Sequence, residues 1–327
     1  MGKFKVGIIG CGLIGNKRAA NLPGHELAIV ADNNLERAKS LAEKYNCSYS
    51  SNYKDVINSD AGIVIVSTTN DMLAPIAIEA AGKGKHILLE KPCARSPPEL
   101  EGLIEAAKRS KVKVKTGFNH RHHPAMIKAR ELVESKSFGR VMYIRARYGH
   151  GARLGYEKEW RAKREIAGGG ELLDQGSHLI DLGRMFLGDF ADAIGYCKTC
   201  FWDMEVEDNC FALLRAKKGQ IMQLHASWTE WKNLFSFEIF CERAKIDING
   251  LGGSYGPETL TLYKMKPEMG VPDKEIFTFD GGDQSWKLEF LDLVDAIENN
   301  KALPDLENAR KNLSDISKIY SWNEKIK

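Results

Sequence analysis

Short apolar runs alternate with helical patterns along the first third of the chain. Runs of mainly apolar residues predict strands at 5–9, 26–31, 63–67, 86–90 and 112–117. Between them, apolar residues at helical spacing predict helices at 15–22, 35–45, 73–82 and 97–109. This alternation is typical of βαβ units, so we predict a parallel sheet in this part of the chain.

The pattern changes after about residue 118. A helix at 124–135, a strand at 141–148 and a helix from about 171 to 186 come first. Alternating or aromatic-rich runs then predict strands at 193–202, 209–216, 221–229, 235–240, 244–248 and 259–263. Tight turns such as Lys217-Lys218-Gly219 favour a largely antiparallel sheet. Two helices, at 284–299 and 306–320, close the chain.

A glycine-rich turn follows the first expected strand. Gly10, Gly12 and Gly15 form a G-x-G-x-x-G motif that also contains Leu13 and Ile14 and opens a helix. The first glycine allows the tight turn, the second lets backbone approach a pyrophosphate, and the third lets the helix pack on the strand. In this strand-turn-helix context the motif predicts dinucleotide binding rather than a structural turn.

Asp32 ends the second expected strand, where a carboxylate hydrogen-bonds the adenosine ribose of a dinucleotide. A carboxylate accepts hydrogen bonds from both ribose hydroxyls but repels a 2′-phosphate, so we predict NAD in preference to NADP. Asn33 follows, and Arg37 lies one turn into the next helix. We expect Arg37 to face solvent, although it could pair with a 2′-phosphate, so dual use of NAD and NADP stays open.

The tripeptide Glu90-Lys91-Pro92 lies at the end of the strand predicted at 86–90. Ligands of open parallel sheets bind at the carboxyl ends of the strands, so a lysine at this point is directed at a cofactor and its substrate. The alternative is a surface lysine before a loop proline. The glycine turn and Asp32 favour the functional interpretation.

A second group of candidate residues follows the triple glycine 168–170. Asp174 and His178 are four residues apart on the predicted helix and therefore project from one face. A carboxylate beside an imidazole raises its pKa and orients it, which suits proton exchange near neutral pH. A helix-terminal aspartate with a core histidine is the plain alternative. Further ligands at zinc-site spacing are not found, so we predict no metal.

Composition excludes several other classes of protein. With 327 residues and 43% hydrophobic residues, two domains with substantial cores are expected. The net charge of +3 is spread along the chain, which argues against nucleic acid as the main partner. No apolar run approaches the roughly 20 residues of a membrane span, so we expect a cytoplasmic protein with no membrane partner. Seven scattered cysteines do not predict a disulfide framework.

Together these motifs resemble the glucose-fructose oxidoreductase / inositol dehydrogenase / MocA (GFO/IDH/MocA) family over nearly the whole chain. The resemblance is carried by residues 10–15, 68–77, 90–92, 117–121, 160–161 and 168–178. It implies that Lys91, Asp174 and His178 surround the substrate carbon and the nicotinamide. Two departures are the sequence of residues 68–73, where relatives often read T-P-N-x-x-H, and the histidine-rich segment 120–123.

On this basis we assign the candidate site residues. Besides the glycine turn, Asp32, Asn33 and Arg37, the cofactor site takes Ser67, Thr68, Thr69, Asn70, Glu90, Lys91, Asn119, Arg121, Trp160 and Arg161. The substrate site takes Lys91, His120, Arg147, Arg153, Asp174 and His178. The chemistry needs a hydride acceptor against the C–H bond and a base near the O–H. We expect His178 to accept the proton, Lys91 to polarise the oxygen and Asp174 to orient the imidazole, while either Lys91 or His178 could be the principal proton carrier.

The substrate class is less clearly indicated. A basic segment between the domains contains Arg145, Arg147, His150, Arg153, Lys158, Arg161, Lys163 and Arg164. Guanidinium groups match phosphate and carboxylate oxygens, which favours a nucleotide sugar or a sugar acid over inositol or a free sugar. The rival functions are a non-catalytic NAD-sensing binding protein, against which the three catalytic candidates argue, and an NAD-dependent glycosidase.

We therefore predict an α/β protein with two domains. Residues 1–120 form an N-terminal Rossmann dinucleotide-binding domain. Residues 121–327 form a C-terminal α+β domain with a large, mostly antiparallel open sheet, and the C-terminal helix packs back on the first domain. One face of this sheet is apolar and too broad to leave in water, so we expect a homodimer or homotetramer.

Overall fold

The computed structural model describes residues 2–325 and divides into two compact units. Unit 1 contains residues 2–118 and 286–310, and unit 2 contains residues 119–285 and 311–325. The division therefore falls at Phe118/Asn119 and returns the segment 286–310 to the first unit. Within the described residues, no helix is both long enough and apolar enough to cross a membrane.

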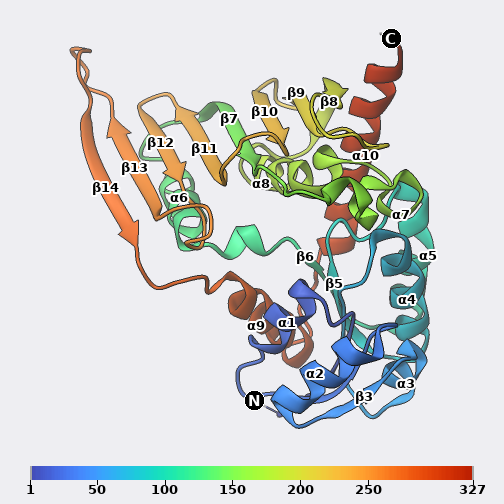
Figure 1. Cartoon of the computed structure of the whole chain (residues 1–327). Helices are drawn as coiled ribbons and strands as arrows, with labels where there is room; N and C mark the ends of the chain where they lie inside the picture. Colours follow the sequence, from blue (N-terminus) through green and yellow to red (C-terminus); the bar gives the residue numbers. More distant parts are fainter. Residues whose placement is uncertain (1, 326–327) are drawn as a thin grey trace. The chain divides into compact units, whose positions relative to one another are not determined.

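Unit 1 is built on a six-stranded parallel sheet with the order β3-β2-β1-β4-β5-β6. Figure 1 labels β3, β5 and β6 of this sheet. The strands are β1 (Lys5–Ile9), β2 (Glu26–Ala31), β3 (Ser48–Ser50), β4 (Ile63–Val66), β5 (His86–Glu90) and β6 (Val114–Gly117). Between them run α1 (Leu13–Ala19), α2 (Leu35–Tyr45), α3 (Tyr53–Asn58), α4 (Asn70–Gly82) and α5 (Pro97–Ser110). The strand order reverses between β1 and β4, and ligands bind at such a switch point, outside the carboxyl ends of the strands. The predicted Rossmann fold is confirmed.

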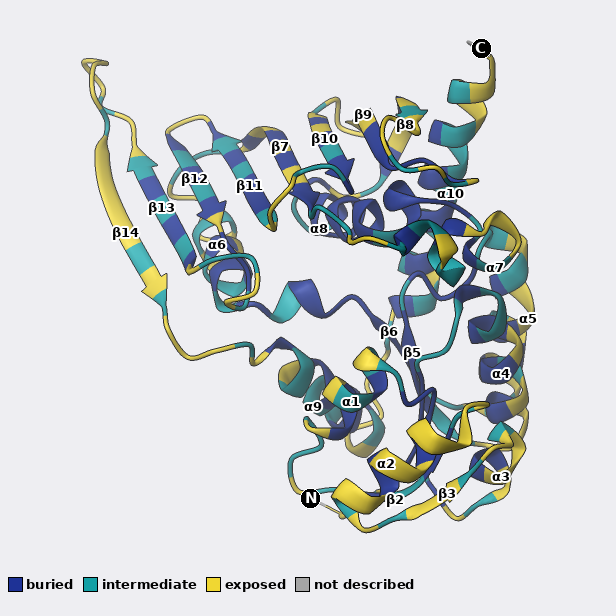
Figure 2. Ribbon diagram, viewed as in Figure 1, coloured by how far each residue is buried: buried dark blue, intermediate teal, exposed yellow. Residues whose placement is uncertain are grey.

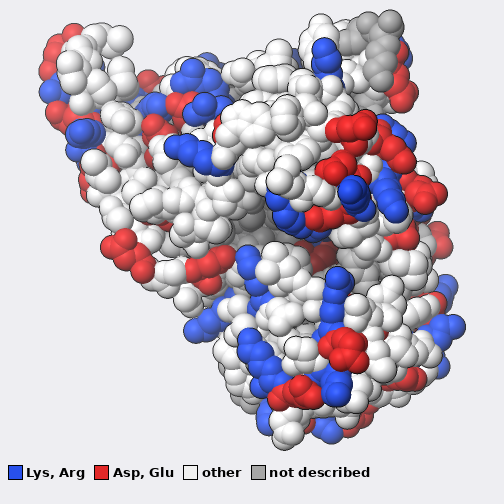
Figure 3. All heavy atoms as spheres, in the orientation of Figure 1, with Lys and Arg blue, Asp and Glu red and all other residues white. Residues whose placement is uncertain are grey.

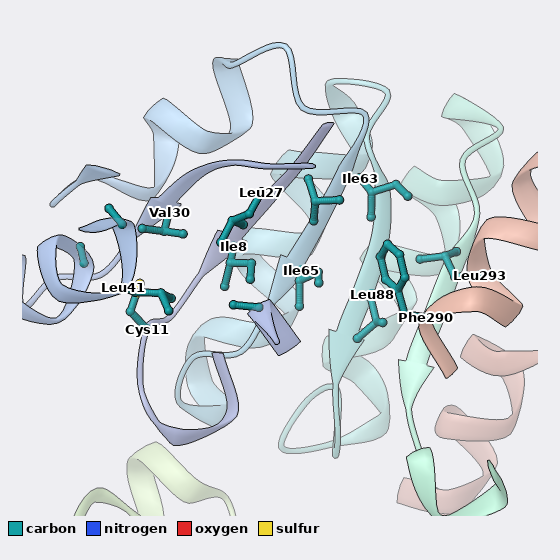
Figure 4. Close-up of a cluster of buried hydrophobic side chains, with 14 of the residues drawn as sticks. Ile8, Cys11, Leu27, Val30, Leu41, Ile63, Ile65, Leu88, Phe290 and Leu293 are labelled. Atoms are coloured by element: carbon teal, nitrogen blue, oxygen red, sulfur yellow. The ribbon is translucent and has the colours of Figure 1, made fainter. Parts of the chain in front are cut away.

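The core of unit 1 explains why its strands could be recognised from the sequence. Helices cover both faces of the sheet, so nearly every side chain of β4 and β5 is buried and the strands read as continuous apolar runs. Figure 4 shows Ile8, Val30 and Ile65 packed together in this core. Phe290 and Leu293 join it from α9 (Ser285–Glu298), which is why residues 286–310 belong to this unit.

Unit 2 contains an eight-stranded sheet with the order β14-β13-β12-β11-β7-β10-β9-β8. The strands are β7 (Val141–Gly149), β8 (Phe190–Lys198), β9 (Asn209–Ala216), β10 (Ile221–Ser227), β11 (Leu234–Cys241), β12 (Ala244–Asn249), β13 (Glu258–Lys264) and β14 (Asp273–Phe279). Strands β7 and β10 pair in parallel, whereas the other neighbouring strands pair antiparallel. The predicted mostly antiparallel sheet is confirmed. Buried and less buried positions alternate along β12 and β13, as Figure 2 shows.

Helices of unit 2 cover the buried face of this sheet. They are the 3-10 turns η1 (Asn119–His122), η2 (Tyr156–Lys158) and η3 (Trp160–Ala162), the helices α6 (Pro124–Glu134), α7 (Arg164–Ala167) and α8 (Ser177–Leu187), and the later part of α10 (Asp305–Lys325). A π-helical turn, η4 (Leu172–Gly176), leads directly into α8. The helix predicted at 171–186 is therefore two elements, and the wider first turn contains Asp174.

Candidate active site

The glycine turn between β1 and α1 has the geometry of a diphosphate cradle. Gly10 has a φ of +95°, and a Cβ atom there would lie 2.4 Å from the Ser67 carbonyl oxygen. A Cβ atom on Gly15 would lie 1.9 Å from the Gly10 carbonyl oxygen. A Cβ atom on Gly12 would meet nothing within 4 Å, so this glycine leaves open space at the helix N-terminus. The turn therefore fits a dinucleotide. Packing requires glycine at the first and third positions, and glycine at the second leaves room for a diphosphate to approach the backbone.

Asp32 lies beside this turn at the end of β2. Its Oδ2 accepts a hydrogen bond from the Cys11 backbone N–H at 2.7 Å, and its Oδ1 accepts one from the Asn34 N–H at 2.8 Å. These bonds orient the carboxylate in the position that suits a ribose. Asn33 and Arg37 are exposed.

Four more candidate residues follow β4 at the same edge of the sheet. The Ser67 hydroxyl donates to the Gly10 carbonyl oxygen at 2.8 Å, which ties this loop to the glycine turn. Thr68 and Thr69 are half-buried, and Thr69 is the N-cap residue of α4. Asn70 is the first residue of α4 and is buried, so the helix begins three residues earlier than predicted.

Buried charges hold the residue that precedes Lys91. The Arg18 side chain is 1% exposed, and its Nε lies 2.7 Å from Glu90 Oε1. Its Nη1 lies 2.7 Å from Glu289 Oε2, and its guanidinium lies over the Trp286 ring, 4.5 Å from the centroid. Glu90 is thereby fixed at the carboxyl end of β5, and Lys91 follows it half-buried. We name Arg18, Glu90 and Glu289 the ionic anchor.

The anchor contains more negative than positive charge, and this is reflected in one of its carboxyls. Burial raises the pKa of Glu289 to about 7, with Glu90 adding to the effect, while Arg18 and Lys115 oppose it. A group that titrates near neutral pH therefore lies behind the strand end that carries Lys91.

In unit 2, aromatic rings surround His178. Its ring is stacked on that of His120, with the centroids 3.7 Å apart and the planes 11° from parallel. His120 Nδ1 lies 3.1 Å from Asn119 Oδ1, and His120 Nε2 lies 3.0 Å from the Tyr148 hydroxyl. His120 and His178 are both buried. The predicted catalytic histidine thus packs against a second histidine whose two nitrogens both have partners.

Two tyrosines extend this cluster. The Tyr148 and Tyr255 hydroxyls are hydrogen-bonded to each other, and the Gln175 Nε2 donates to the Tyr255 hydroxyl at 3.0 Å. Burial raises the pKa of Tyr255 to about 12 and also raises that of Tyr148, and the charges of Glu171 and Asp174 act in the same direction. Both phenols therefore keep their protons and can donate.

The remaining candidates of unit 2 are held by ion pairs. Asp174 Oδ2 lies 3.5 Å from Arg161 Nε, and the Arg161 guanidinium covers the Trp160 ring at 4.4 Å. Arg121 binds both carboxylate oxygens of Asp181, with 2.6 Å between its Nε and Oδ2. The candidate proton-handling residues and the candidate cofactor residues of this unit are therefore neighbours.

Arg147 and Arg153 are not brought into this cluster. Successive residues of a strand point to opposite faces, so Arg147 projects away from the face where Tyr148 meets His120. It is exposed on the open side of the sheet. Arg153 is exposed and pairs with Glu159 at 2.6 Å. The structure does not support the assignment of Arg147 to the same site as His178.

Carboxylates neutralise much of the basic segment that suggested an anionic substrate. Arg145 pairs with Glu238 at 3.0 Å, Arg153 with Glu159 at 2.6 Å and Arg161 with Asp174 at 3.5 Å. On the face drawn in Figure 3, basic and acidic residues are interspersed. The segment therefore carries less unopposed positive charge than its sequence suggests.

Sequence reasoning missed five residues that shape the candidate sites of the two units: Arg18, Glu289, Tyr148, Gln175 and Tyr255. Tyr148 had a usable signal, because it shares the buried side of β7 with Ile144 and Ala146 and follows them at a spacing of two. Tyr255 lies in the glycine-rich loop before β13, where no periodicity assigns a side to it. Among the side chains that the structure describes, no three His, Cys, Asp or Glu residues are placed to hold a metal ion.

Comparisons with known proteins agree with this architecture. Residues 4–118 match the family model described as an oxidoreductase family with an NAD-binding Rossmann fold, and residues 126–247 match a GFO/IDH/MocA C-terminal domain. The chain is 32% identical over 291 residues to levoglucosan dehydrogenase of Pseudarthrobacter phenanthrenivorans, covering 76% of this chain and 74% of that protein. It is 30% identical over 274 residues to 1,5-anhydro-D-fructose reductase of Ensifer adhaerens, covering 81% of this chain and 82% of that protein.

A solved structure shows the same fold. The structure of a levoglucosan dehydrogenase in complex with NADH superimposes with a TM-score of 0.89 at 23% identity, covering 99% of this chain and 98% of that chain. At this identity the likeness concerns the fold alone.

Proposed function

Because the chain belongs to the GFO/IDH/MocA oxidoreductase family, we propose that it interconverts a secondary alcohol and a ketone on a neutral sugar or polyol. The family membership makes it an NAD-binding dehydrogenase that acts on CH–OH groups. The observation that carries the substrate proposal is the pairing of the basic segment with carboxylates, since a free cationic pocket would suit an anion. A nucleotide sugar or sugar acid is the second candidate, favoured by the number of basic residues between Arg145 and Arg164.

The proposed chemistry divides between the two units. NAD supplies the hydride acceptor when it is bound. His178 accepts the hydroxyl proton as the C–H bond gives up its hydride, which leaves a neutral ketone. The Lys91 ammonium group donates a hydrogen bond to the same oxygen and stabilises the negative charge that develops there. Asp174 accepts from a substrate hydroxyl and fixes its orientation.

The relatives support a search among small sugars. The protein at 32% identity is named for levoglucosan and the one at 30% for 1,5-anhydro-D-fructose, both compact and uncharged. We expect NADH formation with at least one member of a panel of levoglucosan, myo-inositol, free hexoses, gluconate, glucose 6-phosphate and UDP-glucose. Turnover only of the last three would overturn the neutral-substrate proposal. No turnover of any compound would favour the NAD-sensing binding protein, and sugar release without net NADH would favour the glycosidase.

The roles of the catalytic groups are tested with the best substrate from that panel. Lys91→Met and His178→Phe should each lower single-turnover hydride transfer by about 10²-fold or more, because each removes a group that moves or stabilises charge at the reacting oxygen. Near-normal transfer in either variant would remove that residue from the mechanism. NADH binding, measured by fluorescence, serves as the control for intact unit 1.

We also propose that two copies associate through the open side of the eight-stranded sheet. This side presents the exposed apolar residues Tyr143, Tyr196, Phe211, Leu213, Ile221 and Ile276. Such an area suits a self-complementary interface. Light scattering should give a dimer or larger for the wild type and a smaller species for Leu213→Glu; a monomeric wild type would refute the proposal.

A further inference from the structure

A continuous series of hydrogen bonds crosses unit 2 and ends at Gln175, the residue that follows Asp174 in η4. In order it contains Asp283, Ser285, Asn119, His120, Tyr148, Tyr255 and Gln175. We name it the polar chain. Each member is a side chain, and all of them lie in residues 119–285. Because its bonds link donors to acceptors in sequence, fixing the direction of one bond fixes the direction of the rest.

The direction is set at the Asp283 end. A carboxylate can only accept, so the Ser285 hydroxyl donates to Asp283 Oδ1, at 2.5 Å. The Ser285 oxygen is then free to accept, and it receives the Asn119 Nδ2–H at 2.7 Å. The Asn119 amide is thereby oriented, and its Oδ1 faces His120 Nδ1 at 3.1 Å. His120 Nδ1 therefore carries the hydrogen.

The same direction continues through the aromatic members. In a neutral imidazole one nitrogen donates and the other accepts, so His120 Nε2 accepts the Tyr148 O–H at 3.0 Å. The Tyr148 and Tyr255 hydroxyls are hydrogen-bonded to each other, and the Tyr255 oxygen accepts the Gln175 Nε2–H at 3.0 Å. The polar chain thus orients the Gln175 amide as well and leaves its Oε1 as the terminal acceptor.

This terminal acceptor is buried. Gln175 is 7% exposed, and its Oε1 has no hydrogen-bond partner among the residues that the structure describes. Native proteins rarely leave a buried acceptor in this state, so the atom requires an explanation. Gln175 follows Asp174 in the π-helical turn η4, a distortion of the helix that recurs at functional sites.

We propose that Gln175 Oε1 accepts a hydrogen bond from a hydroxyl of the substrate, a second hydroxyl beside the one that His178 deprotonates. The inference rests on the proposed function and names what this subsite selects, which is a hydrogen-bond donor. A carboxylate, a phosphate oxygen, an ether or a ketone at that point offers only acceptors and leaves two acceptors facing each other. The polar chain prevents the amide from turning to suit them, because a flip would break its bond with Tyr255.

The test compares a Gln175→Met variant with the wild type on the best neutral substrate and on its mono-deoxy analogues. Methionine keeps the length of the side chain and removes the acceptor. In the wild type, removal of one particular hydroxyl should lower kcat/KM roughly 10- to 100-fold. Gln175→Met should lower kcat/KM for the parent compound by about the same factor. For that one deoxy analogue, kcat/KM should be nearly the same in the variant as in the wild type. Gln220→Met is the matched control, since Gln220 Oε1 is also buried without a partner but lies in the turn between β9 and β10.

The outcomes separate the inference from the proposed function. If removal of each hydroxyl lowers kcat/KM by the same factor in the wild type and in Gln175→Met, Gln175 does not contact a substrate hydroxyl and the inference is overturned. Turnover of the parent compound would still support the proposed function. The inference would also be overturned if Gln220→Met no longer distinguished the parent compound from that deoxy analogue. If no compound is turned over, the proposed function fails. The inference is then tested by calorimetry, which compares the Kd values of myo-inositol and its deoxy analogues in the wild type and in Gln175→Met.

A test on the substrate side needs no variant. Replacing the selected hydroxyl by fluorine keeps a weak acceptor and removes the donor. We expect the fluoro analogue to be as poor a substrate for the wild type as the deoxy analogue. Recovery of kcat/KM with fluorine would show that the hydroxyl accepts at this point and would contradict the inference.

Discussion

The surroundings of Lys91 in unit 1 and of His178 in unit 2 are held by opposite physical means, while Asp174 of unit 2 is paired with Arg161. In unit 1 the ionic anchor buries three charges behind the strand end that precedes Lys91. In unit 2, neutral hydrogen bonds and a stacked ring hold His120 against His178. Buried charges are costly to remove singly and respond to pH, whereas neutral hydrogen bonds fix which atom donates and which accepts. The buried charges suit the role proposed for Lys91, and the hydrogen-bonded rings suit the role proposed for His178.

The suitability follows from what each group does in the proposed reaction. In the proposed reaction Lys91 donates a hydrogen bond and does not change its charge. The constant charges of the ionic anchor are therefore compatible with its role. His178 changes its charge in every turnover. A neutral His120 ring tolerates both states of His178, whereas an imidazolium stacked at 3.7 Å would oppose proton uptake.

Removal of Arg18 should have the largest effect on stability. Arg18→Met leaves the buried Glu90 and Glu289 carboxylates without their cation, which should lower the free energy of unfolding by about 3–5 kcal/mol. Arg310→Met is the control, because Arg310 pairs with Glu307 at the surface and should cost less than about 1 kcal/mol. Urea unfolding at neutral pH measures both. Equal costs would show that the anchor does not hold unit 1.

Glu289 should give the anchor a pH dependence. Its pKa of about 7 lies above the usual value of 4.5, so between these limits the folded protein holds a proton that the unfolded chain releases. The stabilisation is complete below the unfolded pKa and is lost as pH rises through the folded pKa, a change of about 3 kcal/mol. In Glu289→Gln this loss should be absent.

The measurement is urea unfolding from about pH 5 to about pH 8 for both proteins. The groups that face Glu289 are Arg18, Glu90 and Lys115, and all three remain in the variant. The difference in the free energy of unfolding between wild type and variant should therefore change by about 3 kcal/mol over this pH range. Parallel curves would mean that Glu289 is ionised throughout and that the anchor is insensitive to pH.

The anchor also marks a limit of prediction from sequence. The strands and helices of unit 1 could be predicted because burial on both faces produces continuous apolar runs and the glycine turn has a required context. Arg18 lies on a helix face that, by pattern alone, looks solvated. Only the return of α9 from residues 285–298 buries it, and no local pattern predicts such a distant contact.

The short and irregular elements were missed for related reasons. β3 and α3 are short and partly exposed, and the edge strand β14 has few positions buried enough to show a period of two. The π-helical turn keeps helical composition, so the sequence indicates a helix without its change of pitch. Asp174 and His178 could be chosen from residue type and resemblance. Gln175 became a candidate only when its unpartnered oxygen and the direction of the polar chain were visible.

A smaller effect is expected from breaking the polar chain at its centre. Tyr148→Phe removes the donor to His120 Nε2, and the unsatisfied nitrogen should cost about 1–3 kcal/mol of stability. The freed nitrogen can then take a proton. A cation stacked on His178 disfavours a second one, so the limb of the pH profile of kcat/KM that reports His178 should move to lower pH.

Tyr49→Phe is the matched control for this change, because Tyr49 is 46% exposed on β3 of unit 1. It should change stability by less than about 0.5 kcal/mol and leave the pH profile in place. If Tyr148→Phe lost stability without moving the profile, Tyr148 would support packing only and the neutral environment of His178 would not depend on it.

The smallest expected effect belongs to Arg147, which the sequence assigned to the substrate site. Arg147→Ala should leave kcat/KM within about twofold of the wild type, because the side chain projects from the face of β7 opposite to Tyr148. Arg161→Ala is the contrasting variant, since Arg161 lies 3.5 Å from the Asp174 carboxylate and its loss should change KM and kcat together. A large loss in Arg147→Ala would mean that a charge from the open side of the sheet reaches the substrate. That result would weaken the contrast between the ionic anchor next to Lys91 and the rings around His178, and it would return an anionic substrate to first place.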